Sequence, residues 1–129
     1  MQSSNYSSFK NAVARGENFI PVFNSWPADL ETPLTTWLKV GDKKPPGVLL
    51  ESVEGGENLG RWSVVASDPI WTASVKGDVL HRAWRNGHSD SFQGNPFEGL
   101  RKWMDCYRLT PIPELPPLGQ LYGMWGYEL

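Results

Sequence analysis

The sequence feature that most constrains the fold is a series of short apolar segments in the middle of the chain, separated by tight-turn signals. The segments "RWSVVAS", "IWTASVK" and "VLHRAWR" are rich in β-branched and aromatic residues, as strands with one buried face are. Gly77-Asp78 and Asn86-Gly87 supply the positive φ angles that two-residue hairpins require. The middle of the chain is therefore predicted to be an antiparallel meander.

Three short helices are predicted to flank this sheet, at residues 7–15, 32–40 and 96–108. Thr32-Pro33 and Asn95-Pro96 each place a side-chain cap before a proline that suits the first helical position. Apolar side chains then recur at three-to-four spacing in the last helix. The predicted fold class is α+β, with a largely antiparallel sheet and a few short flanking helices.

Three remaining segments complete the predicted organisation. "NFIPVFNSW" indicates a strand, which Pro21 restricts to a sheet edge, and "SDSFQG" indicates a loop. The closing "GQLYGMWGYEL" indicates a strand that another backbone or a ligand approaches closely at its glycines. Because that strand reaches Leu129 without a turn or a polar tail, we expect the native chain to continue beyond it.

Size and charge limit the classes of function. A chain of 129 residues with 40% hydrophobic residues can bury one core, so residues 1–129 are predicted to form a single domain. A net charge of -2 offers no basic stripe for nucleic acid, and no apolar run is long enough to span a membrane. The start shows no secretory signal, and the single cysteine, Cys106, excludes an internal disulfide. We expect a cytoplasmic protein with neither nucleic acid nor membrane as a partner.

The segment after Val48–Leu50 carries the strongest chemical signal. If that apolar strand is buried, strand alternation directs either Glu51 or Ser52 inward, and a buried carboxylate without a partner costs several kcal/mol. The partner cation could be Arg61 or the ammonium group of a ligand. An α-amino acid would use all three side chains, with Glu51 facing its ammonium and Ser52 and Arg61 facing its carboxylate.

Other candidate groups have simpler explanations. "GGENLG" lacks the lysine and the following helix of a phosphate loop, and it indicates a turn. His81 and His88 flank a hairpin turn without an evident nucleophile. The acidic run Glu51, Glu54 and Glu57 is typical of a solvated face, with a metal as a minor possibility. No catalytic or metal-binding residue is assigned to this chain.

Four segments carry a resemblance to a known family. "IPVF", "DLETPLTTWL", "LLESVEGGENLGRWSVVASDP" and "PPLGQLYGMWGYEL" follow, in order, the N-terminal region of component I of anthranilate synthase, a chorismate-utilising enzyme. The resemblance covers nearly the whole chain from Phe19 onward, and the Leu-Leu-Glu-Ser element is its most diagnostic part. Gln120 and Met124 depart from the family's glycine-rich pattern near the end.

The resemblance implies a fold, an activity and a regulatory site. The parent enzyme would convert chorismate and ammonia to anthranilate and pyruvate, with Mg²⁺ and with a glutamine amidotransferase component as its partner. The catalytic, Mg²⁺-binding C-terminal part is absent, so this truncated part of a larger α/β sandwich should need no cofactor and should be inactive alone. The resemblance further implies an L-tryptophan feedback site at Leu50, Glu51 and Ser52, with Arg61 closing the pocket.

Three alternatives stay open from the sequence. The closest is the corresponding region of aminodeoxychorismate synthase component I, an enzyme of p-aminobenzoate and folate synthesis. Another is a stand-alone amino-acid-binding module. The third is a structural wall without a ligand, in which Glu51 pairs with Arg61.

Overall fold

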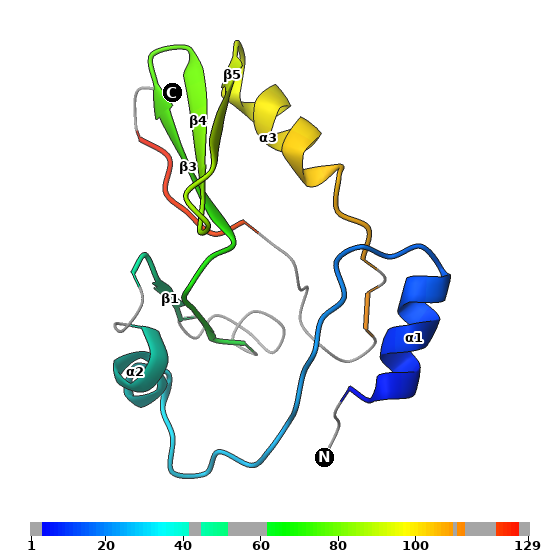
Figure 1. Cartoon of the computed structure of the whole chain (residues 1–129). Coiled ribbons are helices and arrows are strands. Elements are labelled where there is room, and N and C mark those ends of the chain that lie inside the picture. The colour runs from blue at the N-terminus through cyan, green and yellow to red at the C-terminus, as the bar shows by residue number, and fades with distance from the viewer. Residues whose placement is uncertain (1–3, 42–44, 52–61, 110, 113–120, 127–129) are drawn as a thin grey trace. The chain divides into compact units, whose positions relative to one another are not determined.

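The computed structural model describes residues 4–41, 45–51, 62–109, 111–112 and 121–126 (Figure 1). By contact, the chain divides into two compact units. The first unit is Met1–Ser25 with Pro69–Pro111, and the second unit is Trp26–Asp68 with Ile112–Leu129. The single domain expected from chain length stays a prediction.

The first unit contains the predicted meander. Its strands are β3 (Trp71–Lys76), β4 (Val79–Trp84) and β5 (Ser89–Gln93), paired antiparallel in the order β3-β4-β5. Helix α3 (Pro96–Met104) contacts β4 and β5 and lies beside β5 in Figure 1. This arrangement confirms the predicted pairing of "IWTASVK" with "VLHRAWR". The prediction that "RWSVVAS" joins the same meander was wrong, because Val64–Ala66 pairs with Val48–Leu50 in a separate two-stranded sheet. Helix α3 ends four residues before the predicted boundary at 108.

The third strand of the meander corrects the prediction of a loop at residues 89–94. Gly77 and Gly87 adopt φ angles of +61° and +87° in the two turns, as predicted, and the second turn returns the chain alongside β4. Phe92 then pairs with Leu80. The loop prediction was wrong because four of the five strand residues are polar. Phe92 is the one apolar residue, so the segment lacks the apolar–polar alternation that marks a half-buried strand.

The core of the first unit lies between the meander and α3. The buried hydrophobic residues of the described part of the chain are Ala12, Trp71, Leu80 and Trp103. Gly99 of α3 is also buried. A Cβ there would lie only 2.7 Å from Cδ1 of Phe92 and 2.8 Å from Cδ2 of Leu80. The missing side chain at Gly99 therefore allows the helix to approach the sheet closely.

Helix α1 (Tyr6–Ala14) lies within one residue of its predicted bounds. Its N-cap is Asn5, whose side chain accepts a hydrogen bond from the Ser8 amide at 2.8 Å. Gly16 follows the helix with a φ of +79°, as expected of the residue that stops it.

The predicted edge strand at residues 18–26 is wrong. The segment contains only an isolated bridge at Asn24. At its start, the amides of Asn18 and Phe19 donate to the carbonyl of Arg108 at 3.2 and 3.3 Å, and the Asn18 side chain accepts from the Arg108 amide at 2.7 Å. These amides are therefore hydrogen-bonded to the segment after α3 and not to a neighbouring strand. Pro21 has no amide hydrogen that could pair with a strand.

The second unit joins a helix to a pair of short strands. Helix α2 (Pro33–Thr36) continues into a π-helix, η1 (Trp37–Gly41). Strand β1 (Val48–Leu50) pairs antiparallel with β2 (Val64–Ala66), and both strands contact η1. These elements confirm a helix near the predicted 32–40, and the two antiparallel sheets with short helices confirm the α+β class.

The closing segment does not form the predicted strand where it is described. Residues 121–126 lie in no strand, and the rest of "GQLYGMWGYEL" lies outside the described residues. A strand that is apolar on both faces needs partners to pair with and to cover it, and the described residues supply neither. Within the described ranges, no helix is both long and apolar enough to cross a membrane.

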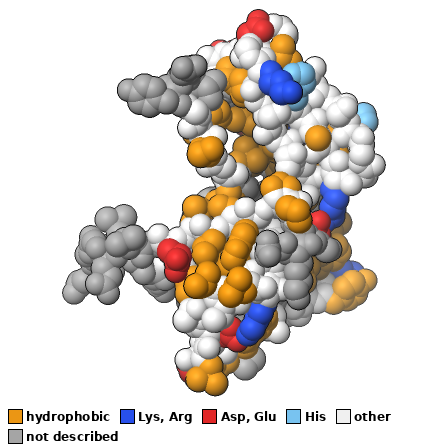
Figure 2. Space-filling view, turned by 90° about the vertical axis from the view of Figure 1, so that its left-hand side faces the viewer, with side chains coloured by type: hydrophobic (Ala, Val, Ile, Leu, Met, Phe, Trp, Pro, Cys, Tyr) orange, Lys and Arg blue, Asp and Glu red, His pale blue; other side chains and the backbone are white. Residues whose placement is uncertain are grey.

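Large hydrophobic side chains lie at the surface, and a space-filling view shows them in orange (Figure 2). The exposed ones in the second unit include Trp26, Leu30, Leu34, Leu38, Val40, Leu50 and Trp62. The helix α2–η1 thus presents much of its apolar stripe to solvent.

Candidate functional site

The predicted site residues fall at the end of strand β1. Leu50 is the last residue of β1, pairs with Val64 and is 46% exposed. Glu51 follows it and is exposed. Ser52 and Arg61 lie outside the described residues. The structure therefore places Leu50 and Glu51 side by side at one strand end and leaves the other two positions as predictions.

The exposure of Glu51 changes the argument for a partner cation. The sequence predicted that Glu51 or Ser52 would turn into the core, where a carboxylate would need a compensating charge. An exposed carboxylate stays hydrated and pays no such penalty. Glu51 therefore has no partner imposed by burial, and its carboxylate is accessible to a ligand.

The described residues do not provide a metal site. In the described ranges, His, Cys, Asp and Glu side chains form no group of three that could hold a metal ion. Glu54 and Glu57, the other members of the acidic run, lie outside the described residues.

Trp37 of η1 packs against the two glycines that precede the predicted site. A Cβ at Gly41 would lie only 2.0 Å from Cε3 of Trp37. A Cβ at Gly47 would lie 2.8 Å from Cη2 of Trp37 and 2.7 Å from the carbonyl oxygen of Gly41. Gly47 directly precedes β1, so this contact lies at the start of the strand. Sequence analysis missed this cluster, whose only signal is a tryptophan followed by two isolated glycines.

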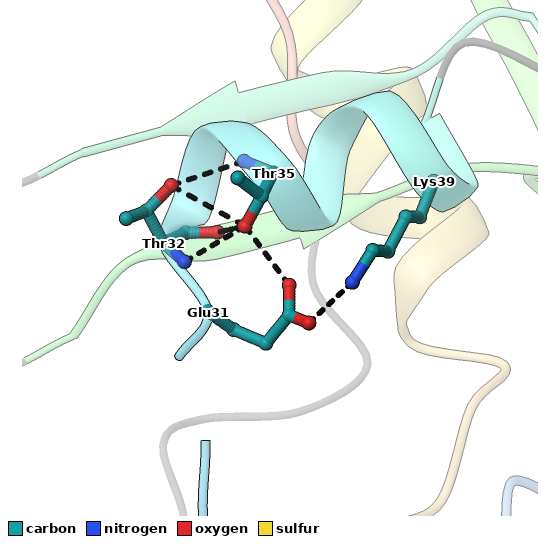
Figure 3. Close-up of polar contacts among 4 residues, drawn as sticks. All are labelled: Glu31, Thr32, Thr35 and Lys39. Carbon is teal, nitrogen blue, oxygen red and sulfur yellow. Dashed lines mark hydrogen bonds and ion pairs between the residues drawn. The ribbon is translucent and has the colours of Figure 1, made fainter. Parts of the chain in front are cut away.

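A polar network fixes the start of helix α2 (Figure 3). The Thr35 amide donates to Oγ1 of Thr32 at 3.1 Å, and the Thr32 amide donates to Oγ1 of Thr35 at 2.8 Å, which is a reciprocal capping box. Glu31 accepts from the Thr35 hydroxyl at 2.9 Å and pairs with Lys39. The hydrogen bond from Lys39, followed by that from Thr35, lowers the pKa of Glu31.

The first unit contains a charged cluster around Arg82, which sequence analysis missed. The Arg82 guanidinium lies 4.3 Å from the ring centroid of Trp103, 4.7 Å from that of Trp84 and 5.6 Å from that of Trp71. Its Nε donates to Oδ1 of Asp90 at 2.8 Å, and the Arg82 side chain is 11% exposed. The hydrogen bond from Arg82 lowers the pKa of Asp90, and the same bond raises the pKa of Arg82. Both charges are compensated, so this cluster is structural.

A pocket of about 320 Å³ lies over the other face of the meander. It is lined by Thr72, Ser74, His81, Arg82, Ala83, Ser89, Asp90 and Ser91. Strand alternation places Thr72, His81 and Ser91 opposite the face that packs on α3. None of the predicted site residues lines this polar surface, and we assign it no ligand.

Comparison with known proteins identifies the family. No family model and no solved structure matches the chain. The chain is 45% identical over 130 residues to a protein named anthranilate synthase component 1 from Synechocystis sp., and 33% and 34% identical to proteins of the same name from Cereibacter sphaeroides and Neisseria gonorrhoeae. These alignments cover 100%, 98% and 93% of this chain.

The alignments cover only part of each relative. The chain spans about a quarter of their length, at 25%, 26% and 24%. The resemblance carried by "LLESVEGGENLGRWS" is thereby confirmed along the whole chain. By sequence, the chain belongs with the N-terminal region of anthranilate synthase component 1.

Proposed function

We propose that this chain is the N-terminal regulatory region of a longer, cytoplasmic anthranilate synthase component 1 and that it binds L-tryptophan as a feedback effector. The observation that carries the proposal is the alignment of the entire chain with relatives of that name, at up to 45% identity among those compared. The full-length enzyme would convert chorismate and glutamine-derived ammonia to anthranilate and pyruvate in tryptophan biosynthesis.

The partners follow from the same proposal. A glutamine amidotransferase component would deliver the ammonia, and the catalytic C-terminal part of the same chain would bind chorismate. The parent enzyme would also use Mg²⁺. The residues described in this chain do not fit a Mg²⁺ site, because they gather no group of three metal-ligating side chains. The family resemblance assigns the metal to the catalytic part, and on the same ground this chain is expected to have no activity alone.

The end of β1 has groups that suit a tryptophan ligand. The exposed carboxylate of Glu51 matches the ligand's ammonium, and the half-exposed side chain of Leu50 offers apolar contact to the indole. The hydroxyl of Ser52 and the guanidinium of Arg61 would bind the ligand carboxylate. Inhibition then follows from coupling, because tryptophan would favour an arrangement of the two parts of the enzyme that does not turn over chorismate.

The proposal is tested by substitution in the full-length enzyme. Glu51→Gln and Ser52→Ala are assayed for anthranilate formation at increasing L-tryptophan, with Glu98→Gln on α3 as the matched control. A lost hydrogen bond to a charged group corresponds to roughly a tenfold or greater rise in the inhibitory concentration for Glu51→Gln, and a smaller rise for Ser52→Ala. The control should behave as the unmodified enzyme.

The result that would contradict the proposal is unchanged inhibition in both variants, which would remove the Leu-Glu-Ser element from the effector site. An enzyme that forms aminodeoxychorismate and ignores tryptophan would favour the p-aminobenzoate branch instead. The relatives compared above carry the anthranilate synthase name, and this favours the tryptophan branch.

A further inference from the structure

We infer that Trp37 is a positioning residue for the effector site, acting through Gly41 and Gly47 on strand β1. The inference rests on the proposed tryptophan site at the end of that strand. It adds a group that the sequence resemblance does not assign and that lies before the Leu-Glu-Ser element in the chain.

The geometry leaves no space at this contact. The Trp37 ring covers Gly41 so closely that a Cβ there would lie 2.0, 2.4 and 2.5 Å from three ring carbons. Gly47 is itself exposed, but a Cβ there would lie 2.8 Å from the same ring and 2.7 Å from the carbonyl oxygen of Gly41. Real Cβ atoms do not approach other heavy atoms this closely, so both positions require glycine as long as the indole is in place.

The strand that this contact holds has little else to fix it. β1 is three residues long, and its only described strand partner is β2, through Val48–Ala66, Leu49–Val65 and Leu50–Val64. A pair of three-residue strands is marginal without packing against another element. Because Leu50 is three residues after Gly47, a displacement at Gly47 moves Leu50 and Glu51 with it.

The local helix geometry gives a second, independent observation. Trp37–Gly41 is a π-helix, whereas the preceding turn, Pro33–Thr36, is an ordinary α-helix. Such π-helical turns are rare, and they occur frequently at functional sites. Here the wide turn places the Trp37 ring over the residue that ends the helix. The element thus joins the capped helix α2 to the strand that ends at the proposed site.

The inference predicts a steric effect that the tryptophan ring itself controls. In the full-length enzyme, Gly41→Ala forces the indole off its place and should raise the inhibitory L-tryptophan concentration about tenfold, which is within the range of overpacking effects. Trp37→Leu removes the ring and should also weaken inhibition. The double variant Gly41→Ala/Trp37→Leu should be inhibited by L-tryptophan as strongly as Trp37→Leu alone, because the added methyl group then has no ring to displace.

Gly99→Ala is the matched control. It introduces the same kind of clash in the first unit, against Phe92 and Leu80, at 2.7 and 2.8 Å. It should lower thermal stability without changing the response to tryptophan. Direct titration of L-tryptophan into each full-length variant separates binding from turnover, and Trp37→Phe serves where Gly41→Ala does not fold.

The outcomes separate this inference from the proposed function. If Ser52→Ala and Glu51→Gln weaken inhibition but Gly41→Ala, Trp37→Leu and Trp37→Phe do not, the effector site stands and the role of Trp37 is overturned. Equal effects of Gly41→Ala and Gly99→Ala overturn it too, since both then act through general instability. If the effects of Gly41→Ala and Trp37→Leu on inhibition add in the double variant, the role of Trp37 is likewise overturned, because the two changes then act independently. Loss of inhibition in none of these variants overturns both proposals.

Discussion

At the scale of single residues, Arg82 shows how a charge is accommodated at the margin of a small core. Its guanidinium lies close to three tryptophan rings and donates two hydrogen bonds to the Asp90 carboxylate. Lysine keeps the charge but has neither the planar stacking surface nor the paired donors. Arg82→Lys is therefore expected to lower the free energy of unfolding by about 1–2 kcal/mol in urea denaturation. Arg101→Lys, on the exposed side of α3, is the control, and equal losses in the two variants would contradict a special role for Arg82.

The same ion pair predicts a pH dependence. Because Arg82 lowers the pKa of Asp90 below its ordinary value of 3.8, the native state binds fewer protons at this site than the unfolded state. The stability that the pair contributes is fully present above the ordinary carboxyl pKa and is lost as the pH falls through the lowered native value. Thermal unfolding from pH 7 to pH 2 should show the difference between the unmodified chain and Asp90→Asn shrinking towards the acid end. A constant difference would show that Asp90 contributes through shape rather than charge.

At the scale of elements, the start of α2 depends on two threonine hydroxyls. Thr32→Ala removes the acceptor for the Thr35 amide, and loss of such a cap costs about 1 kcal/mol. Amides in residues 36–41 should then exchange with solvent roughly fivefold faster, measured by hydrogen exchange. Thr36→Ala, one residue beyond the capping box, should leave the exchange rates nearly unchanged. Equal acceleration by both variants would show that the box does not hold the helix.

Two helix N-caps and two hairpin turns were the features that the sequence predicted best. Thr32 and Asn95 cap their helices as expected, and Gly77 and Gly87 take the expected positive φ angles. These features are local, since each needs only a side chain and the backbone beside it. Strand β5 was missed because its pairing depends on β4. The segment at residues 18–26 was over-predicted because β-propensity does not state whether a partner strand exists.

At the scale of the whole molecule, burial is concentrated in one of the two units. Within the described residues, the four buried hydrophobic residues all belong to the first unit, and Leu80 is 1% exposed. Hydrogen exchange of the 129-residue chain should therefore show the strongest protection in β3, β4 and α3 and weaker protection in β1 and β2. Equal protection throughout would show that β1 and β2 open only by global unfolding, as a fully cooperative single domain requires.

Substitution of the most buried side chain supplies a complementary test. Leu80→Ala leaves a cavity between the meander and α3 and should cost about 2–5 kcal/mol of unfolding free energy. The cost should appear as faster exchange in the meander, with Leu34→Ala on the exposed face of α2 as the control. A loss below that of the control would mean that the site collapses around the cavity.

The sequence by itself determined the family, the α+β class, two helix caps and two turns, and the place of Leu50 and Glu51 at the end of an apolar strand. These depend on residue identity and local backbone preference, which act over a few positions. Only the tertiary structure decided that Glu51 is exposed, that β5 pairs with β4, that three tryptophans surround Arg82 and that Trp37 covers Gly41 and Gly47. Each of these results from packing between elements, where the free energy depends on which surfaces meet, and no local pattern of residues encodes that.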